Sequence, residues 1–424
     1  MKIRRSLVVA AGVAASMLAL TACSGTSGTS GTSGGTVDLT VWTGFTGGDR
    51  PGYDTIVKDF NASHPNIHVT MNVQPWDTIA QKLPSAWLTG QGPDIAAPSS
   101  DPNAIAQFVK TNSVLAITNT GSGDTKINTD KLAPGTVKEF TYNGKLYAVP
   151  ANFATLSLYY NKKAFAAAGI AGPPTTVAEL QADAKKLTLN GGQTQYGLSL
   201  ADNQTIQMWP ILQWLEGGDI VDAKGCSVVQ TSAGQKSLST WSDLVVQDKI
   251  SPVGQTGAQA DSLFSAGKAA MEINGPWAAP GYKSAGIDLG IAKVPVGVDG
   301  SSVTLGSTAP LAVSAKTKHP QEAQEFLAYW TSKTAQEKFS LQTGFPPLRT
   351  DLADDAKLKA DPTVSIFTSQ VPDSRLYLPH VTNATQVDAN AYVPLIGQIT
   401  RGTSVASATA DAAKTIDSLT GCSK

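Results

Sequence analysis

The chain has 424 residues and a formal net charge of −1, and 15% of its residues are charged. A chain of this length is too long to fold around one simple hydrophobic core, so we expect two lobes or domains. The near-neutral charge argues against a nucleic-acid-binding protein, which would carry a basic patch or stripe.

The N-terminal segment has the order of an export signal. Basic residues at the start precede an apolar run from Leu7 to Leu20, and small residues lead to Cys23. The run is short for a membrane span, which needs about 20 residues. The segment resembles a bacterial lipobox, which implies that residues 1–22 are a lipoprotein signal peptide and that Cys23 receives a diacylglycerol. The alternative is an ordinary cleaved signal with an incidental cysteine.

Residues 23–36 are the expected tether between lipid and folded body. The sequence SGTSGTSGTSGG follows Cys23 and offers nothing to bury, which favours a flexible coil. A diacylated cysteine supplies two acyl chains, and stable anchoring generally takes more than one. We therefore expect a body held near a membrane, outside the cytoplasm.

The spacing of apolar residues predicts the order of elements in the folded body. The first are a strand at 37–41, a helix at 53–61, a strand at 67–73, a helix at 78–88 and a strand from 94. This alternation predicts an α/β fold with helices on both faces of a sheet. The later predictions are β structure at 145–161, strands at 289–294 and 311–314, and helices at 103–109, 162–168, 176–187, 261–270, 320–331 and 405–419.

The sequence lacks the common signatures of catalysis and metal binding. It has no GxxxxGK[ST] loop, no HExxH and no GxSxG. Ser265-Ala-Gly-Lys268 matches the SxxK of penicillin-binding enzymes without its partner motifs, and we interpret it as a helix end turning at Gly267. We expect no cofactor and no metal. An exported glycoside hydrolase stays an alternative, because its two carboxylates need only be near in space.

Cys226 and Cys422 are the two cysteines that remain beside Cys23. In an oxidising compartment they can form a disulfide, and the alternative is two buried free thiols. The sequence leaves both open, because it does not give the separation of their Cα atoms.

Several segments, in order along nearly the whole mature chain, resemble bacterial extracellular solute-binding proteins of ABC importers, in the family of the maltose-binding protein. The most specific segment is FSAGKAAMEINGPW, which ends at Trp277. The other matching segments are Val41-Trp42 with the Gly-rich loop after it, GPDI at 92–95, YNGKLYAVP at 142–150, LSLYYNK at 156–162 and PQEAQEFL at 320–327.

The resemblance implies a two-lobed periplasmic-binding-protein-like fold, with ligand held in the cleft and closure by hinge motion. The expected N-terminal lobe is 37–150 with 295–342, and the expected C-terminal lobe is 151–294 with 343–424. The chain would cross between the lobes near 150–153, near 294 and near 343–347.

The resemblance also implies a non-enzymatic monomer that delivers a carbohydrate, expected to be an oligosaccharide, to ABC permease subunits. In this function a lipid anchor would keep the receptor at the outer face of the cytoplasmic membrane, beside its permease. The alternative ligands are a polyol, a glycerol phosphate or a polyamine. A site for a phosphorylated ligand would need Arg or Lys side chains at helix N-termini.

Trp277 and Asp101 are the leading ligand candidates under this resemblance. The family places this tryptophan against a sugar ring, whose CH-rich face packs on an aromatic plane. The alternative for Trp277 is a core tryptophan after a proline turn. The family has an acidic residue near Asp101 that accepts hydrogen bonds from sugar hydroxyls. Asp101 is also a candidate N-cap, because Pro102 follows it.

Other positions match the family's cleft more loosely, and Trp214, Trp241 and Trp330 are expected in the core. The looser candidates are Trp42, Asp49 and Arg50 in the first ligand loop, Phe153 at the cleft floor, Trp209 in a Trp-Pro pair, Asn390 and Tyr392 near a cleft tryptophan of the family, and Trp76 and Arg349 in loops near the cleft.

Overall fold

The computed structural model describes residues 35–99, 102–123, 125–204, 206, 208–378, 381 and 383–422. The predicted signal peptide, the lipidation candidate Cys23 and the ligand candidate Asp101 lie outside the described residues, as does nearly all of the predicted tether. Residues 36–424 form one compact unit, and the fold below is that of this unit alone.

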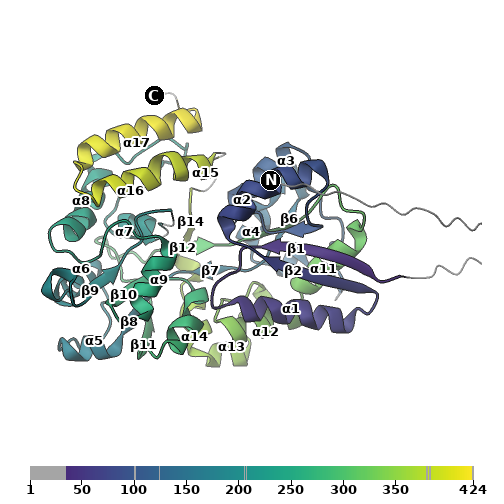
Figure 1. Cartoon of the computed structure of the whole chain (residues 1–424), viewed down its shortest axis with the longest axis horizontal. Coiled ribbons are helices and arrows are strands. Elements are labelled where there is room, and N and C mark those ends of the chain that lie inside the picture. Colours follow the sequence, from purple (N-terminus) through teal and green to yellow (C-terminus); the bar gives the residue numbers. More distant parts are fainter. Residues whose placement is uncertain are drawn as a thin grey trace, which may run out of the picture. The chain divides into compact units, whose positions relative to one another are not determined.

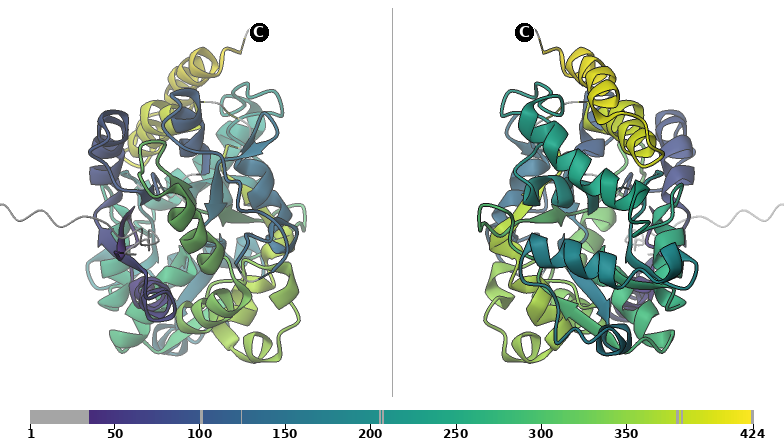
Figure 2. Two further views of the ribbon diagram at one scale, coloured as in Figure 1. Left: turned by 90° about the vertical axis from the view of Figure 1, so that its right-hand side faces the viewer. Right: turned by 90° about the vertical axis from the view of Figure 1, so that its left-hand side faces the viewer.

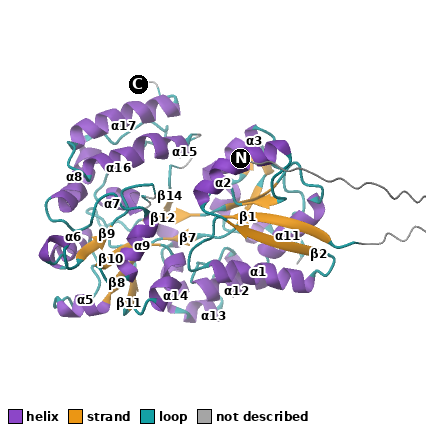
Figure 3. Cartoon of the chain, viewed as in Figure 1, coloured by secondary structure: helices purple, strands orange, loops and turns teal. Residues whose placement is uncertain are grey.

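The N-terminal lobe is built on a five-stranded sheet in the order β2-β1-β3-β13-β6. Figure 3 shows β1 and β2 of this sheet side by side. β1 pairs in parallel with β2 along its whole length and with β3 near its end, whereas β13 runs antiparallel to β3 and β6. The strands are β1 (Val37–Thr43), β2 (Ile67–Val73), β3 (Ile95–Ala96), β6 (Ala148–Pro150) and β13 (Pro310–Val313), and β4 (Thr141–Tyr142) with β5 (Lys145–Leu146) forms a hairpin before β6.

Helices from both halves of the sequence cover this sheet. The second segment of the lobe supplies α11 and α12, which pack beside α1 (Figure 1). Ile56, Val57 and Phe60 of α1 are buried at the helical spacing seen in the sequence. The helices of the lobe are α1 (Arg50–Ser63), α2 (Trp76–Thr89), α3 (Ile105–Lys110), α4 (Pro134–Glu139), α11 (Pro320–Trp330) and α12 (Lys333–Thr343).

The C-terminal lobe is built on a four-stranded sheet in the order β11-β8-β10-β9. Thr176 caps α6 in a reciprocal capping box with Glu179. The strands are β8 (Ser157–Asn161), β9 (Tyr196–Ser199), β10 (Ala269–Asn274) and β11 (Leu289–Ala292). The helices are α5 (Lys162–Ala167), α6 (Val177–Lys186), α7 (Met208–Leu215), α8 (Ser232–Val246), α9 (Gly257–Ser265), α10 (Ala279–Ser284), α13 (Ala356–Ala360), α14 (Pro362–Thr368), α15 (Ala384–Val387), α16 (Val393–Ile399) and α17 (Val405–Thr420).

A three-stranded sheet, β14-β12-β7, lies between the two larger sheets (Figure 1). Its strands are β7 (Ala154–Thr155), β12 (Thr304–Ser307) and β14 (Ser374–Leu376). β7 belongs to the first chain crossing and β12 to the return, and they pair antiparallel. The crossing segments are therefore hydrogen-bonded to each other.

Two of the crossings lie later in the chain than the sequence suggests. The backbone N–H groups of Val296 and Val298 donate to Thr175 and Leu215 of the C-terminal lobe, so the return runs through β12 and not at residue 294. Leu348 is buried in the core of the N-terminal lobe, and its carbonyl accepts from Ala133. The last crossing therefore follows residue 348.

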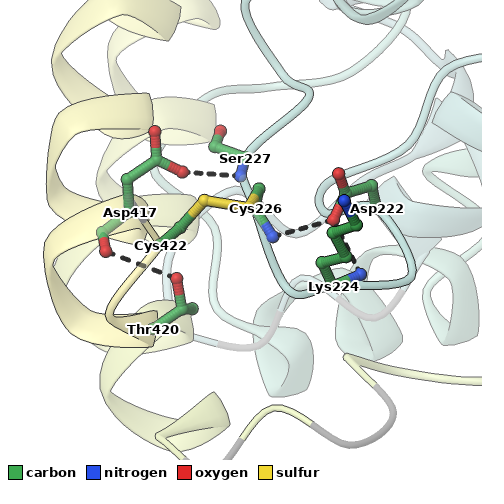
Figure 4. Close-up of a disulfide and its surroundings, with 7 residues drawn as sticks. All are labelled: Asp222, Lys224, Cys226, Ser227, Asp417, Thr420 and Cys422. Atoms are coloured by element: carbon green, nitrogen blue, oxygen red, sulfur yellow. Dashed lines mark hydrogen bonds between the residues drawn. A yellow bond between two sulfur atoms is a disulfide. The ribbon is translucent and has the colours of Figure 1, made fainter. Parts of the chain in front are cut away.

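A disulfide links the end of the chain just after helix α17 to the body of its lobe. The side views show α17 beside α16 (Figure 2). Cys226 and Cys422 are bonded, with their Cα atoms 5.3 Å apart, so the disulfide alternative holds (Figure 4). Next to it, the carboxylate of Asp417 accepts from the backbone N–H of Ser227 at 2.7 Å.

Most predicted elements are present within a few residues of their predicted ends, with one clear error. The helix predicted at 261–270 ends at Ser265. Gly267 then turns the chain with a φ of +68°, and Ala269 already starts β10. Trp214, Trp241 and Trp330 lie in the core as predicted. Within the described part of the chain, none of the helices is long and apolar enough to cross a membrane.

Candidate ligand-binding site

A cavity of about 290 Å³ lies between the two lobes. Its walls come from the loop between β1 and α1, the first crossing, α9, the end of β10, and Phe345 beyond α12. The lining residues are Gly44, Phe45, Thr46, Gly47, Asp49, Trp76, Asn152, Ala154, Leu156, Met208, Gly257, Ala258, Asp261, Ile273, Asn274, Trp277, Ser307, Ala309 and Phe345. The cavity therefore draws on both lobes and on the segments that join them.

Two tryptophans line this cavity, and each rests on a glycine. A Cβ atom on Gly44 would fall 2.0 Å from the ring of Trp76, and one on Gly275 would fall 2.2 Å from the ring of Trp277. Any side chain at either glycine would displace the ring, so these glycines set the ring positions. Both tryptophans are half-buried, which leaves part of each ring for a ligand.

Further aromatic rings support the two tryptophans. Phe45 stacks on Tyr53 with ring centroids 3.9 Å apart and meets Trp76 edge-on at 5.5 Å. Phe345 lies 6.3 Å from Trp277. Aromatic pairs at these separations add stability beyond area burial, so the apolar part of the cavity is preformed.

Asp49 brings a carboxylate to the cavity from the N-terminal lobe. Its residue is 5% exposed, and burial raises the pKa of its carboxyl group to about 6. Tyr53 donates its hydroxyl to this carboxylate, and Asn152 donates Nδ2 to the hydroxyl of Tyr53 at 2.5 Å. The chain of donors ties the first ligand loop to the first crossing.

Asp261 brings a second carboxylate from the C-terminal lobe. Nδ2 of Asn274 donates to Oδ1 of Asp261 at 2.7 Å and to the hydroxyl of Tyr282 at 2.9 Å. Behind them, Glu272 is fully buried and hydrogen-bonded to both Asp261 and Tyr282. Burial and the neighbouring charge of Asp261 hold the pKa of Glu272 well above its ordinary value, and burial also raises the pKa of Asp261.

The two lobes touch at one edge of the cavity. A Cβ atom on Gly48, in the first ligand loop, would lie 3.0 Å from the backbone nitrogen of Gly281 and 3.1 Å from the carbonyl oxygen of Trp277. Both distances are shorter than an ordinary van der Waals contact, so a side chain here would push the two backbones apart. The loop before α1 and the turn after β10 are thus in direct contact across the interlobe boundary.

Of the residues predicted from the sequence, the cavity brings together Trp277, Trp76 and Asp49. Three further candidates lie close in the sequence but are not on its wall. Phe153 is buried in the core of the N-terminal lobe, between two residues that do line the cavity. Trp42 packs half-buried against a neighbouring cluster of the same lobe. Arg50 is exposed and lies 3.5 Å from Asp54.

The remaining described candidates have structural partners away from the cavity. Nε1 of Trp209 donates to the carbonyl of Ala201 in the core, and the hydroxyl of the fully buried Tyr392 donates to Gln213. The guanidinium of Arg349 is buried and forms two hydrogen bonds with the Asp351 carboxylate, at 2.9 and 2.8 Å, and one with the carbonyl of Thr331. Asn390 is exposed and does not line the cavity.

The sequence patterns do not indicate three polar residues of the cavity, namely Asp261, Asn274 and Asn152. Asn274 lies inside the most specific segment, where it ends a run of buried residues in β10. A polar side chain closing an apolar strand is a signal that points to a site at the strand end. Asp261 has no such signal, because it reaches Asn274 only through the packing of α9 on β10.

The charged side chains in the described lining of the cavity are all acidic. Among the described residues that line it are two aspartates, and none of these lining residues is Lys, Arg or His. A search of the described residues finds no group of His, Cys, Asp and Glu side chains suited to hold a metal ion. The cavity offers aromatic faces, carboxylates and amides, which suit binding of an organic solute.

The sequence and the fold of the chain are similar to those of known proteins. The chain is 24% identical over 363 residues to the maltotriose-binding protein of Pyrococcus abyssi, which covers 81% of this chain and 73% of that protein. It is 25% identical over 338 residues to the multiple sugar-binding protein of Streptococcus mutans, covering 74% and 76%. The structure is similar to that of the GacH receptor of Streptomyces glaucescens, studied unliganded and with acarbose. That similarity has a TM-score of 0.81 and 25% identity, and it covers 92% of this chain and 100% of the receptor.

Residues 55–366 match the family described as bacterial extracellular solute-binding protein. The match spans both lobes and most of the cavity lining. The family is defined by solute binding and not by catalysis, and its fold is the two-lobed one described above. This chain belongs to the bacterial extracellular solute-binding proteins.

Proposed function

We propose that the chain captures a carbohydrate in the interlobe cavity and delivers it to the permease of an ABC importer. The observation that carries this proposal is the placement of Trp76 and Trp277 on one cavity with carboxylate and amide groups around them. The apolar face of a sugar ring packs on an aromatic plane, while its hydroxyls need polar partners at the edge. The cavity supplies both kinds of contact.

The polar groups suit hydroxyl recognition. Asp49 and Asp261 can each accept hydrogen bonds from sugar hydroxyls, and such bonds to a charged acceptor are stronger than neutral ones. The amides of Asn152 and Asn274 also line the cavity. A phosphorylated solute fits less well, because the described lining brings no cation to it.

The size of the cavity favours a short sugar. Its volume of about 290 Å³ is at the lower end of ligand pockets, which run from about 300 to 1,000 Å³. One or two sugar rings are therefore the proposed occupant of the enclosed part. The named relatives support the carbohydrate class, since their names or titles refer to maltotriose, to multiple sugars and to acarbose.

Ligand-dependent thermal unfolding tests the proposal. A ligand that binds only the folded state adds RT ln(1 + [L]/Kd), or about 2.7 kcal/mol at a hundredfold excess over Kd. We expect at least one mono- or disaccharide in a broad panel to raise the melting temperature in a saturable way. Absence of any shift across the panel would reject carbohydrate binding.

The general location of the chain, outside the cytoplasm, follows from its family, which is described as extracellular. The finer proposal is a lipid anchor at Cys23, supported by the order of basic, apolar and small residues before it. The anchor would hold a monomeric receptor beside its permease. The test is Cys23→Ala in the native cell, where we expect the protein to appear in the medium and uptake of the sugar to fall. Retention at the membrane would refute the anchor.

A further inference from the structure

The two carboxyl groups on the cavity come from opposite lobes. Asp49 precedes α1 in the N-terminal lobe, and Asp261 lies on α9 in the C-terminal lobe. Among the described lining residues no Lys, Arg or His balances them. The aromatic rings and the amides that line the rest of the cavity are neutral. The cavity thus has a net negative lining.

The charge of the C-terminal carboxyl pair is directed at the cavity. Glu272 lies behind the wall, and its full burial beside Asp261 raises the pKa of its carboxyl group well above the ordinary value, which favours the protonated form. Its protonated carboxyl group donates to Asp261, which also accepts from Asn274. Because Glu272 is the more deeply buried of the two, the negative charge of the pair is favoured on Asp261, the member that lines the cavity.

In the described part of the chain, Asp49 forms no salt bridge and is hydrogen-bonded by a neutral side chain. Its side-chain donor is the hydroxyl of Tyr53, and its residue is 5% exposed. Burying a carboxylate without a cation is costly, and the cost falls when a positive group pairs with it. A neutral sugar would leave both carboxylates uncompensated, whereas a cationic group would compensate them.

The aromatic rings of the cavity favour the same kind of group. A cation over the face of a tryptophan is attracted by the ring quadrupole, and the attraction grows where water is excluded. Trp76 and Trp277 both line the cavity with part of their rings free. Rings and carboxylates together form an environment that suits a protonated amine.

We propose that the solute is an amino sugar, whose protonated amine lies between the carboxylates of Asp49 and Asp261. This inference rests on the proposed carbohydrate function and narrows its ligand class. The sugar ring packs on the tryptophans, and the amine replaces one hydroxyl as the donor to the two carboxylates. N-acetylation of the amine removes the charge and so removes the preference.

Calorimetric titration at pH 7.5 with matched ligands tests the inference. Each set contains a sugar as the free amine, the N-acetyl form and the hydroxyl form: glucosamine, galactosamine, mannosamine, and the 1,4-linked glucosamine disaccharide with their counterparts. Spermidine serves as an amine without a sugar ring. We expect the free amine of at least one set to bind tenfold or more tightly than both of its counterparts.

Two variants locate the amine. Asp49→Asn and Asp261→Asn should each reduce the amine preference toward unity, while the exposed control Asp130→Asn keeps it. Melting curves of all three establish that they are folded. A preference that survives in both folded variants would overturn the placement of the amine.

The remaining outcomes separate this inference from the proposed function. Hydroxyl or N-acetyl sugars that bind as tightly as the amines would overturn the inference and leave the carbohydrate function intact. Binding of spermidine alone would support the amine site and reject the sugar. Failure of every ligand to bind would reject both.

Discussion

Nδ2 of Asn274 donates a 2.7 Å hydrogen bond to Oδ1 of Asp261 and thereby joins the end of β10 to α9 on the cavity wall. Oδ1 of Asn274 accepts from the N–H of Gly275 at 2.8 Å, so both ends of the amide are used. The amide therefore has a fixed orientation, and it presents a donor to the carboxyl group of Asp261.

Asn274→Asp should destabilise the protein strongly at neutral pH. The change replaces the donor by an acceptor and adds a like charge beside the carboxylate of Asp261. Uncompensated buried charges cost about 3–5 kcal/mol. We expect urea unfolding at pH 7.5 to show a loss of about 3 kcal/mol that shrinks as the pH falls and the new carboxyl group is protonated. Asn72→Asp, at an exposed position, is the control, and an equal effect there would contradict this account.

Asp49→Asn should stabilise the unliganded protein, and more so at higher pH. Burial raises the pKa of Asp49 from about 3.8 to about 6. Protonation of Asp49 therefore stabilises the folded wild type fully below pH 3.8, and this stabilisation is lost as the pH rises through 6. The loss in the free energy of unfolding amounts to about 3 kcal/mol. We expect the stability of the variant relative to the wild type to rise by most of that amount between pH 4.5 and 7.5. A constant difference would contradict the burial of a charged Asp49.

Gly48→Val should weaken ligand binding without unfolding the protein. The added side chain would meet the backbone of Trp277 and Gly281 on the opposite lobe. Overpacking costs about 1–3 kcal/mol, and the lobes can avoid that cost by staying apart. We expect at least a tenfold loss of affinity in calorimetry with a nearly unchanged melting temperature. Gly172→Val, where a Cβ atom meets nothing within 4 Å, is the matched control. Wild-type affinity in Gly48→Val would show that this contact is not needed for binding.

Removal of the disulfide should cost stability but not affinity. Cys226 and Cys422 are 196 residues apart, and the entropy of such a long loop in the unfolded chain predicts a contribution of about 5 kcal/mol at most. Neither residue lines the cavity. We expect Cys226→Ser with Cys422→Ser to unfold at lower urea, by about 2–5 kcal/mol, and to bind ligand as the wild type does. Unchanged stability, or two free thiols in the unreduced wild type, would contradict the pairing.

The parts of the fold that depend on local signals were predictable from the sequence. The capping box of Thr176 and Glu179 and the apolar spacing of α1 involve residues within a turn or two of each other. Helix ends depend on tertiary context as well. The sequence predicts that the helix continues after Ser265. In the structure, Ala269 instead pairs in parallel with Tyr196 of β9.

The candidate site was predictable in part, because the most specific motif contains Trp277 and looser matches in loops contain Trp76 and Asp49. Neighbours on a helix differ by about 100° in direction, so a prediction one residue off points into the core. Met208 lines the cavity, while Trp209 beside it donates to a core carbonyl. Asp261 could not be found from spacing, because it reaches the cavity through the contact of α9 with β10.

We propose that Trp277 holds a sugar in the interlobe cavity. Calorimetric titration of the sugar that gives the largest thermal shift, with the wild type and with Trp277→Ala, tests it most directly. Loss of a buried aromatic contact at a binding site costs about 2 kcal/mol or more, which is roughly a thirtyfold loss of affinity. We expect that loss in Trp277→Ala and wild-type binding in Trp42→Ala, which does not line the cavity. Equal affinity of Trp277→Ala and the wild type would contradict the account.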